Sequence, residues 1–168
     1  MKDIKGENMK FYIKQKVFSF KDQFNVMDEN QNLVYQIKGK FMSITNKLEL
    51  QDSNGEVLLR SNRKVFTIMP KYFIYNIRNE EVATIKRLFS LRPKFDLSIM
   101  RRELTVDGSL FAHSFNIYDN GQVVASIQKK IISWGDTYEI EVFEKDDVEL
   151  FLFVVIVLDQ VIHERKNR

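Results

Sequence analysis

Lysine and arginine gather in the middle of this 168-residue chain. Eleven of them lie between Arg60 and Arg102 against only three carboxylates, so this segment has a formal charge of +8. The rest of the chain carries 15 cations and 20 carboxylates and is therefore acidic. Dense cationic side chains suit phosphate groups, which they bind as point charges or as guanidinium forks. The first chemistry that the sequence indicates is thus the binding of an anionic surface or ligand.

The strongest candidate ligand-binding residues in this segment occur as close pairs along the chain. They are Arg63, Lys64, Lys86, Arg87, Arg92, Lys94, Arg101 and Arg102. A second interpretation stays open, in which these cations only cover the outside of a β-structure and keep it in solution. Anionic lipid headgroups fit the segment better than nucleic acid does, because RNA-binding sheets interleave exposed aromatic side chains for base stacking.

The stretch from Lys86 to Lys94 places Leu88 and Phe89 between four cations. Two structures are compatible with that pattern. In the one we favour, Leu88 and Phe89 finish a strand and face the interior. In the other, both side chains lie at a membrane interface while the cations contact lipid phosphates. Each cation then contributes on the order of 1 kcal/mol to binding near an anionic leaflet.

Residues suited to catalysis are few. The chain has two histidines, His113 in an apolar stretch and His163 near the C-terminus, and neither belongs to a metal-binding or nucleophile motif. Asp146, Asp147 and Glu149 resemble a paired-acid site, but their place before an apolar run favours helix capping and attraction to the helix dipole. We therefore expect no catalytic residues, no metal site, no cofactor and no enzymatic activity.

Composition restricts the class of protein further. The chain has no cysteine, which excludes disulfides and zinc–thiolate sites, and its 44% hydrophobic content is enough for a packed core. The polar residues 1–8 do not resemble a signal peptide, and no run reaches the roughly 18 apolar residues of a membrane-spanning helix. We expect one cytoplasmic domain over residues 1–168, peripheral at the membrane if its ligand is lipid, with a flexible segment at 1–9.

The elements that must position the cations read as β-strands. About a dozen short β-prone runs, several alternating with period two, are separated by turn residues such as Asn54-Gly55 and Asn120-Gly121. These runs are 11–13, 24–26, 33–37, 48–50, 57–59, 65–68, 72–75, 82–85, 95–99, 104–106, 115–118, 123–127 and 138–142. Such tight turns join antiparallel neighbours.

The nine apolar residues from Leu150 to Leu158 form the most informative run. A helix of nine residues advances only about 14 Å, which is too short to cross a bilayer. Because the run is apolar on every helical face, it must be surrounded on all sides. We therefore predict a mainly β protein in which a closed antiparallel barrel of about twelve strands surrounds a central C-terminal helix at 146–163.

A weak internal repeat supports this architecture. Phe24-Asn25-Val26-Met27-Asp28 resembles Phe115-Asn116-Ile117-Tyr118-Asp119 at an offset of 91 residues. After one deletion the similarity continues at an offset of 90, from Val34 and Val124 to Leu50 and Ile140. The barrel is thus predicted to consist of two similar halves.

With these hairpins, the Asp119-Asn120-Gly121 turn and the final hydrophobic helix, the sequence resembles the LURP-one-related family of the tubby-like superfamily, over roughly Lys10 to Arg165. The resemblance implies a twelve-stranded barrel threaded by a C-terminal helix. It also implies kinship with tubby proteins, which bind phosphoinositide headgroups, and distant kinship with phospholipid scramblases. It carries over no activity at individual residues.

Together these observations predict a non-enzymatic binding module for anionic phospholipid headgroups or a phosphorylated ligand. The alternative is a protein-interaction or scaffold domain that docks an acidic partner on the same basic surface. We expect neither a transmembrane segment nor nucleic-acid binding, and the sequence leaves the oligomeric state open.

Overall fold

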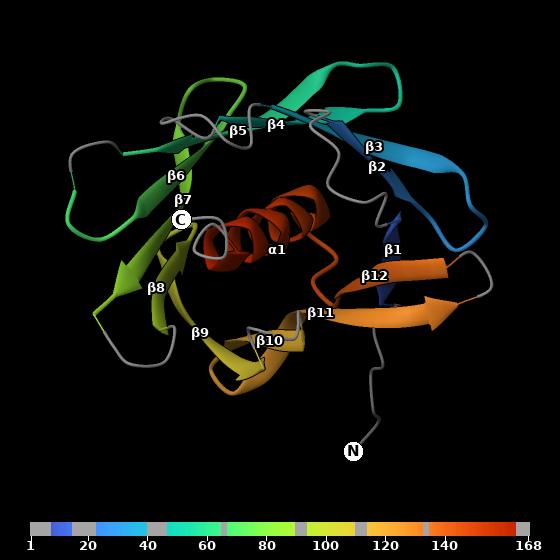
Figure 1. Cartoon of the computed structure of the whole chain (residues 1–168). Coiled ribbons are helices and arrows are strands. Elements are labelled where there is room, and N and C mark those ends of the chain that lie inside the picture. The colour runs from blue at the N-terminus through green and yellow to red at the C-terminus, as the bar shows by residue number, and fades with distance from the viewer. Residues whose placement is uncertain are drawn as a thin grey trace.

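Twelve antiparallel strands form a closed barrel around one helix (Figure 1). The computed structural model describes residues 8–14, 23–39, 47–64, 67–89, 94–109, 114–132 and 135–163. The elements are β1 (Met9–Lys14), β2 (Gln23–Met27), β3 (Leu33–Gly39), β4 (Leu48–Asp52), β5 (Val57–Arg63), β6 (Lys71–Asn76), β7 (Glu81–Leu88), β8 (Lys94–Ile99), β9 (Arg102–Ser109), β10 (Ser114–Asp119), β11 (Gln122–Ile132), β12 (Gly135–Val142) and α1 (Val148–His163). The predicted fold class is confirmed.

Each strand pairs with its neighbours in the sequence, and pairing between β1 and β12 closes the sheet. The closing register runs from Met9 opposite Val142 to Lys14 opposite Thr137. Met9, which we had placed in a flexible N-terminal segment, is therefore the first residue of a paired strand. Closure pairs every described strand with a neighbour on each side, although β1 and β2 share only two paired positions, Tyr12 with Met27 and Ile13 with Val26.

Because the strands run alternately up and down, alternate connections lie at the same end of the barrel. Five short connections, at 28–32, 53–56, 77–80, 100–101 and 120–121, share one end, which we call the turn end. At the other end β3, β5 and β7 finish while β4, β6 and β8 begin. We call this second end the basic end, after the lysines described below.

Three of the short turns repeat with a period of 24 residues. Asp28, Asp52 and Asn76 each accept, through a side-chain oxygen, the backbone N–H groups of the residues two and four positions later. A residue with positive φ follows three positions after each of them, namely Gln31, Gly55 and Asn79. The pairing register also shifts one residue before each turn begins, so the three hairpins share one design.

This repeat predicts a stabilising substitution. Gln31 has φ of 65° at the position that glycine occupies in the second hairpin. A residue with a side chain has a higher conformational free energy in the left-handed region than glycine has. Gln31→Gly should therefore raise the free energy of unfolding by about 0.5–1 kcal/mol. Urea denaturation measures the change, and the reverse substitution, Gly55→Gln, should lower stability. A loss of stability in Gln31→Gly would contradict the prediction.

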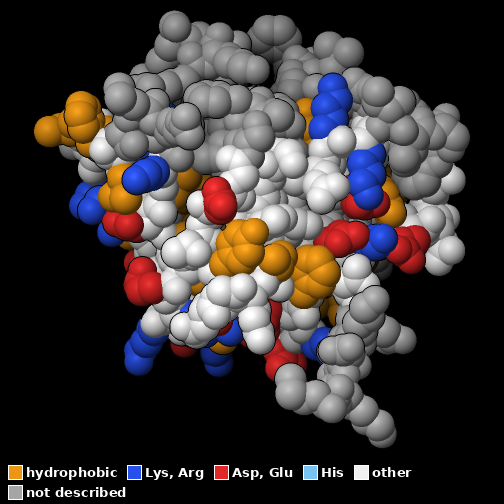
Figure 2. All heavy atoms as spheres, turned by 90° about the horizontal axis from the view of Figure 1, so that it is seen from below, with side chains coloured by type: hydrophobic (Ala, Val, Ile, Leu, Met, Phe, Trp, Pro, Cys, Tyr) orange, Lys and Arg blue, Asp and Glu red, His pale blue; other side chains and the backbone are white. Residues whose placement is uncertain are grey.

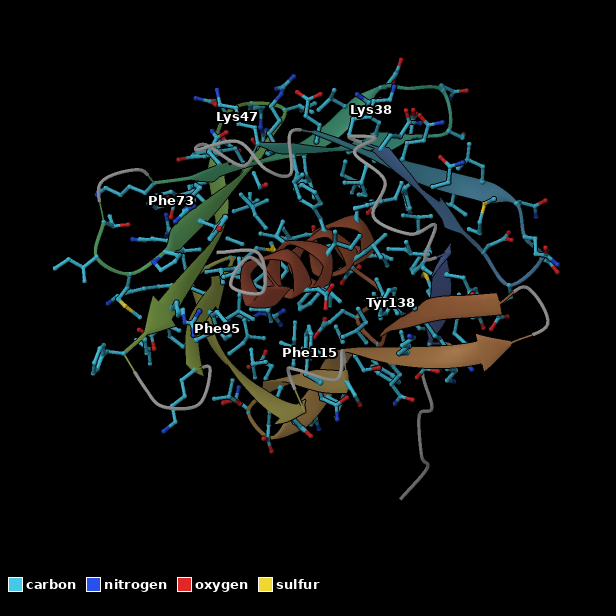
Figure 3. The ribbon with its side chains drawn as sticks, viewed as in Figure 1. Lys38, Lys47, Phe73, Phe95, Phe115 and Tyr138 are labelled. Atoms are coloured by element: carbon cyan, nitrogen blue, oxygen red, sulfur yellow. The ribbon has the colours of Figure 1, made fainter. Side chains whose placement is uncertain are left out.

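The helix α1 fills the barrel, as the sequence predicted. Every residue from Leu150 to Leu158 is at most 6% exposed. Phe95, Phe115 and Tyr138 are buried side chains that lie on the inner side of the sheet, facing α1 (Figure 3). The core is thus one layer of inward strand residues packed around the helix on all sides.

The start of α1 is fixed to the barrel wall at the turn end. The carbonyl oxygen of Asp147 accepts hydrogen bonds from the N–H groups of Leu150 and Phe151 in the first turn of the helix. Glu149, in the first turn, accepts a hydrogen bond of 3.0 Å from the Tyr35 hydroxyl. Burial, and then the Glu149 carboxylate, raise the pKa of Tyr35 above its usual range, so this hydroxyl stays protonated and donates.

The offset of 91 residues has a counterpart in the strand pairing, but the hairpins of β4 with β5 and of β6 with β7 contain similar irregularities, so the pairing does not by itself divide the barrel into two halves. β2 with β3 and β10 with β11 each contain an irregularity, between Val26 and Met27 and between Ile117 and Tyr118. These positions are related by the offset of 91 residues found in the sequence. One predicted strand, 65–68, is wrong where it can be compared with the structure. Thr67 and Ile68 lie in the connection between β5 and β6, and Ile68 is fully exposed.

Candidate functional site

Four lysines gather on the outer surface of β5 to β8, at the basic end of the barrel. Lys71 in β6 is directly opposite Lys86 in β7, and the backbone N–H of Lys64 donates to the carbonyl of Lys71 at 2.8 Å. Lys94 begins β8 opposite Leu88, two residues along the strand from Lys86. Diagonal neighbours of this kind lie about 7–8 Å apart on one face of a sheet. We refer to Lys64, Lys71, Lys86 and Lys94 as the lysine cluster.

The lysine cluster is poorly neutralised by the protein itself. Lys86 has one carboxylate nearby, Asp96 at 4.0 Å, and both side chains are more than half exposed. Such a contact contributes little in water. Lys64, Lys71 and Lys94 have no carboxylate partner among the residues that the structure describes. The Lys71 ammonium instead lies 4.6 Å from the centroid of the Phe73 ring.

Like charges directly opposite each other on two strands destabilise a sheet. The pairing of Lys71 with Lys86 is therefore unfavourable in the isolated protein. An anion bound between the two ammonium groups would attract both of them, so that the interaction of the two lysines with their surroundings would become favourable. The arrangement can bind phosphate oxygens as point charges without any enclosed pocket.

The other candidate residues near the basic end are arranged differently. Arg87 lies beside Lys86 in sequence but faces inward and is only 7% exposed, because successive strand residues alternate between faces. Arg63 is half-buried and pairs with the buried Tyr72. Arg92 lies outside the described residues.

Arg101 and Arg102 lie at the turn end, at the opposite end of β8 from Lys94. The Arg102 guanidinium is 3.0 Å from a carboxylate oxygen of Asp119 and 3.5 Å from one of Glu144. It also lies 5.5 Å from the centroid of the Phe151 ring. These contacts fix the chain leading into α1 against β9 and β10, so Arg102 serves the structure. The seven candidates that the structure describes thus separate into two ends of the barrel.

The structure reveals a separation of charge along the barrel axis. The turn end carries many carboxylates, namely Asp28, Glu29, Asp52, Glu56, Glu80, Glu81, Asp119, Glu144, Asp146, Asp147 and Glu149. The basic end carries further lysines outside the lysine cluster, including Lys38 and Lys47, which lie on the outside of the barrel in Figure 3. On the side that Figure 2 shows, acidic and basic side chains are intermixed. Among the described residues, most carboxylates thus lie toward the turn end, although Arg78, Arg101, Arg102 and Lys145 lie there too, and Glu49, Asp96 and Asp107 lie toward the basic end.

Phe89 overturns part of the favoured interpretation of the stretch from Lys86 to Lys94. We expected it to face the interior, but it is 94% exposed directly after the end of β7. Leu88, which precedes it, is half-buried. The last inward-facing residue of β7 is Arg87. Phe89 lies beyond Leu88, which is the last residue of β7 that pairs with β8.

Sequence reasoning missed Lys71 as a member of the site, along with Lys38 and Lys47. Lys71 stands alone in the sequence, seven residues after Lys64, and has no cationic neighbour. The available signal was topological. In an up-and-down barrel, the residues that flank one connection lie beside those that flank the next connection but one.

The remaining surface offers little for catalysis. No group of three or more His, Asp or Glu side chains suited to a metal ion occurs within the described ranges. A depression of about 210 Å³ on β7 and β8, lined by Glu81, Thr84, Ser98 and Arg101 among others, is smaller than most small-molecule sites. Of the two histidines, His113 lies outside the described residues, and His163 is the last residue of α1. The described part of the chain contains no helix with the length and apolar character needed to cross a membrane.

Comparison with known proteins agrees with this architecture. The chain is 33% identical over 160 residues to the uncharacterized protein YxjI of Bacillus subtilis (strain 168), covering 95% of this chain and 97% of that protein. An X-ray structure of a protein from Arabidopsis thaliana superposes with a TM-score of 0.69 at 20% identity, over 93% of this chain and 92% of the other. At that identity the likeness concerns the fold alone.

A family model described as LURP-one-related matches residues 9–159. The match begins at the first residue of β1 and ends within α1, so it includes all twelve strands and most of the central helix. The chain therefore belongs to the LURP-one-related family.

Proposed function

We propose that this protein is a non-enzymatic binding module for anionic phospholipid headgroups, and that the lysine cluster is its binding surface. The observation that carries the proposal is the placement of Lys71 directly opposite Lys86, flanked by Lys64 and Lys94 on the neighbouring strands. Phosphate groups of a cytoplasmic leaflet or of a soluble phosphorylated ligand would supply the charge that these lysines lack. A membrane is the favoured source because it offers many phosphates to an open, convex surface.

The axial separation of charge supports this function. A protein with a basic end and an acidic end turns in the field of an anionic surface, so that its basic end faces the surface. Electrostatic attraction of this kind falls off within a Debye length, which is about 8 Å at physiological ionic strength. Binding should therefore be orientated at short range and weaken steeply as salt is added.

Reversing the charge of the lysine cluster should abolish this binding. With each basic residue contributing about 1 kcal/mol at an anionic surface, Lys64→Glu/Lys71→Glu/Lys86→Glu should weaken vesicle binding about a hundredfold or more. Co-sedimentation with vesicles of phosphatidylcholine alone and of phosphatidylcholine mixed with phosphatidylserine, at low and physiological salt, measures the effect. Wild-type protein should bind only the mixed vesicles.

A matched control separates the cluster from net charge. Arg78→Glu/Arg101→Glu/Lys145→Glu makes the same change, from +3 to −3, with exposed residues at the turn end. It should bind close to normally. Equal losses in the two triple variants would show that only net charge matters, and absence of wild-type binding at low salt would favour an acidic protein partner. Displacement by inorganic phosphate, but not by chloride at equal ionic strength, would identify a soluble phosphorylated ligand instead.

A further inference from the structure

Two large apolar side chains project fully into solvent at the basic end. Ile68 is 100% exposed in the connection between β5 and β6, and Phe89 is 94% exposed directly after β7. No other described apolar residue of comparable size is as exposed, the next being Ile77 at 69%. Single exposed apolar residues are common on protein surfaces, but two at the same end of one molecule, beside a lysine cluster, require an explanation.

A backbone hydrogen bond holds the two segments together. The N–H of Arg87 donates to the carbonyl oxygen of Pro70 at 3.0 Å. Ile68 lies two residues before Pro70, and Phe89 lies two residues after Arg87. The hydrogen bond continues the contact between β6 and β7 past their last paired residues, Lys71 and Lys86. Both apolar side chains therefore lie in segments that continue directly from the paired ends of β6 and β7, beside the lysine cluster.

The inward Arg87 side chain contributes to this arrangement. Arg87 is buried, so its side chain extends from the end of β7 into the barrel. Leu88 is half-buried on the outer face, and the chain then presents Phe89 beyond the sheet.

We infer that the basic end docks on an anionic bilayer with Ile68 and Phe89 inserted among the lipids, while the lysine cluster contacts the headgroup phosphates. The inference deepens the proposed function and rests on it. A bilayer is the partner that matches both observations, since its surface carries anions and its interior accepts apolar side chains. A soluble phosphate would match the lysines alone. Lysine side chains suit the boundary because their apolar stems can follow a neighbouring apolar residue inward while the ammonium groups stay in water.

Insertion predicts that apolar truncation weakens binding without changing charge. In the 168-residue chain, Ile68→Ala/Phe89→Ala should reduce affinity about tenfold or more for vesicles of equal parts phosphatidylcholine and phosphatidylserine. The control Ile77→Ala/Met100→Ala removes two partly exposed apolar side chains from the turn end and should leave binding unchanged. Insertion also predicts that part of the binding by wild-type protein survives at a salt concentration that removes all binding by the Ile68→Ala/Phe89→Ala variant.

The depth of Phe89 can be measured directly. Because the chain contains no cysteine, Phe89→Cys and Ile77→Cys each introduce a unique site for an environment-sensitive fluorophore. The label at position 89 should shift to shorter wavelength on mixed vesicles and be quenched by nitroxide-labelled acyl chains, whereas the label at position 77 should not change. Salt-sensitive binding with an unshifted label at 89 would overturn insertion and leave the proposed function standing. A wild-type protein that ignores mixed vesicles at low salt would overturn both.

Discussion

Ending the chain at Glu144 should leave a protein that is insoluble or lacks a cooperative unfolding transition. The truncation removes α1, whose residues Leu150 to Leu158 are all buried inside the barrel. Each large apolar side chain contributes about 1.5–3 kcal/mol by its burial, whereas a whole domain is stable by only about 5–15 kcal/mol. The inward faces of twelve strands would then meet water. Circular dichroism during heating, together with the soluble fraction after expression, tests this expectation.

Point substitutions separate loss of the helix from general damage to the chain. Phe153 is fully buried in α1 and Phe89 is 94% exposed, so the same change to alanine compares a buried with an exposed phenylalanine. Phe153→Ala should lower the free energy of unfolding by about 3–5 kcal/mol, and Phe89→Ala should leave it almost unchanged. A truncated protein that stays soluble and melts cooperatively would refute the central role of α1. Equal effects of the two alanine substitutions would do the same.

The architecture was predictable because one sequence feature had few solutions. A nine-residue run that is apolar on all faces, too short for a bilayer, requires a wall around it, and the β-prone runs before it supply that wall. The strand predicted at 65–68 is wrong at Thr67 and Ile68, the two positions that the structure describes, because a β-branched side chain does not by itself require a paired strand. Propensity reports the fit of a side chain to a half-buried surface, and Ile68 is not on such a surface.

The 24-residue repeat of the hairpins was harder to detect. Its determinants are a polar side chain that accepts two N–H groups and a residue three positions later that tolerates positive φ. Different residue types satisfy each condition, as Asp52 and Asn76 do for the first and Gly55 and Asn79 for the second. A search for identical residues therefore does not detect this repeat, whereas the hydrogen bonds of the three turns show it clearly.

The binding surface was only partly predictable, because charge in a segment is not charge on a surface. Lys86 and Arg87 are adjacent in sequence but lie on opposite faces of β7. The period-two alternation of a strand indicates that the two side chains lie on opposite faces, although it does not show which of them faces outward. Grouping Lys71 with Lys86, and separating Arg102 from Lys94, requires the pairing register of β6 to β9. That register is a property of the closed sheet rather than of any single strand.

Of Gly108 and Gly121, Gly108 should be the more damaging one to replace with alanine. Gly108 has φ of 132°, and an added Cβ would lie 2.6 Å from the Ser114 carbonyl oxygen and 2.7 Å from the Phe115 Cα. Those atoms belong to paired backbone in β10, and Phe115 is buried against the core, so they cannot move away cheaply. Overpacking and the unfavourable φ together should lower the free energy of unfolding by about 2–5 kcal/mol.

Gly121 provides the matched control for this substitution. It has φ of 83° in the turn between β10 and β11, but an added Cβ would have nothing within 4 Å. Gly121→Ala therefore tests backbone strain alone, with an expected loss of about 1–2 kcal/mol. The difference between the two denaturation midpoints, measured in urea at constant slope, reports the close approach of β9 to β10. If both variants lose the same stability, the two strands can separate locally at no cost, and Gly108 is retained for its φ rather than for the space that it leaves free.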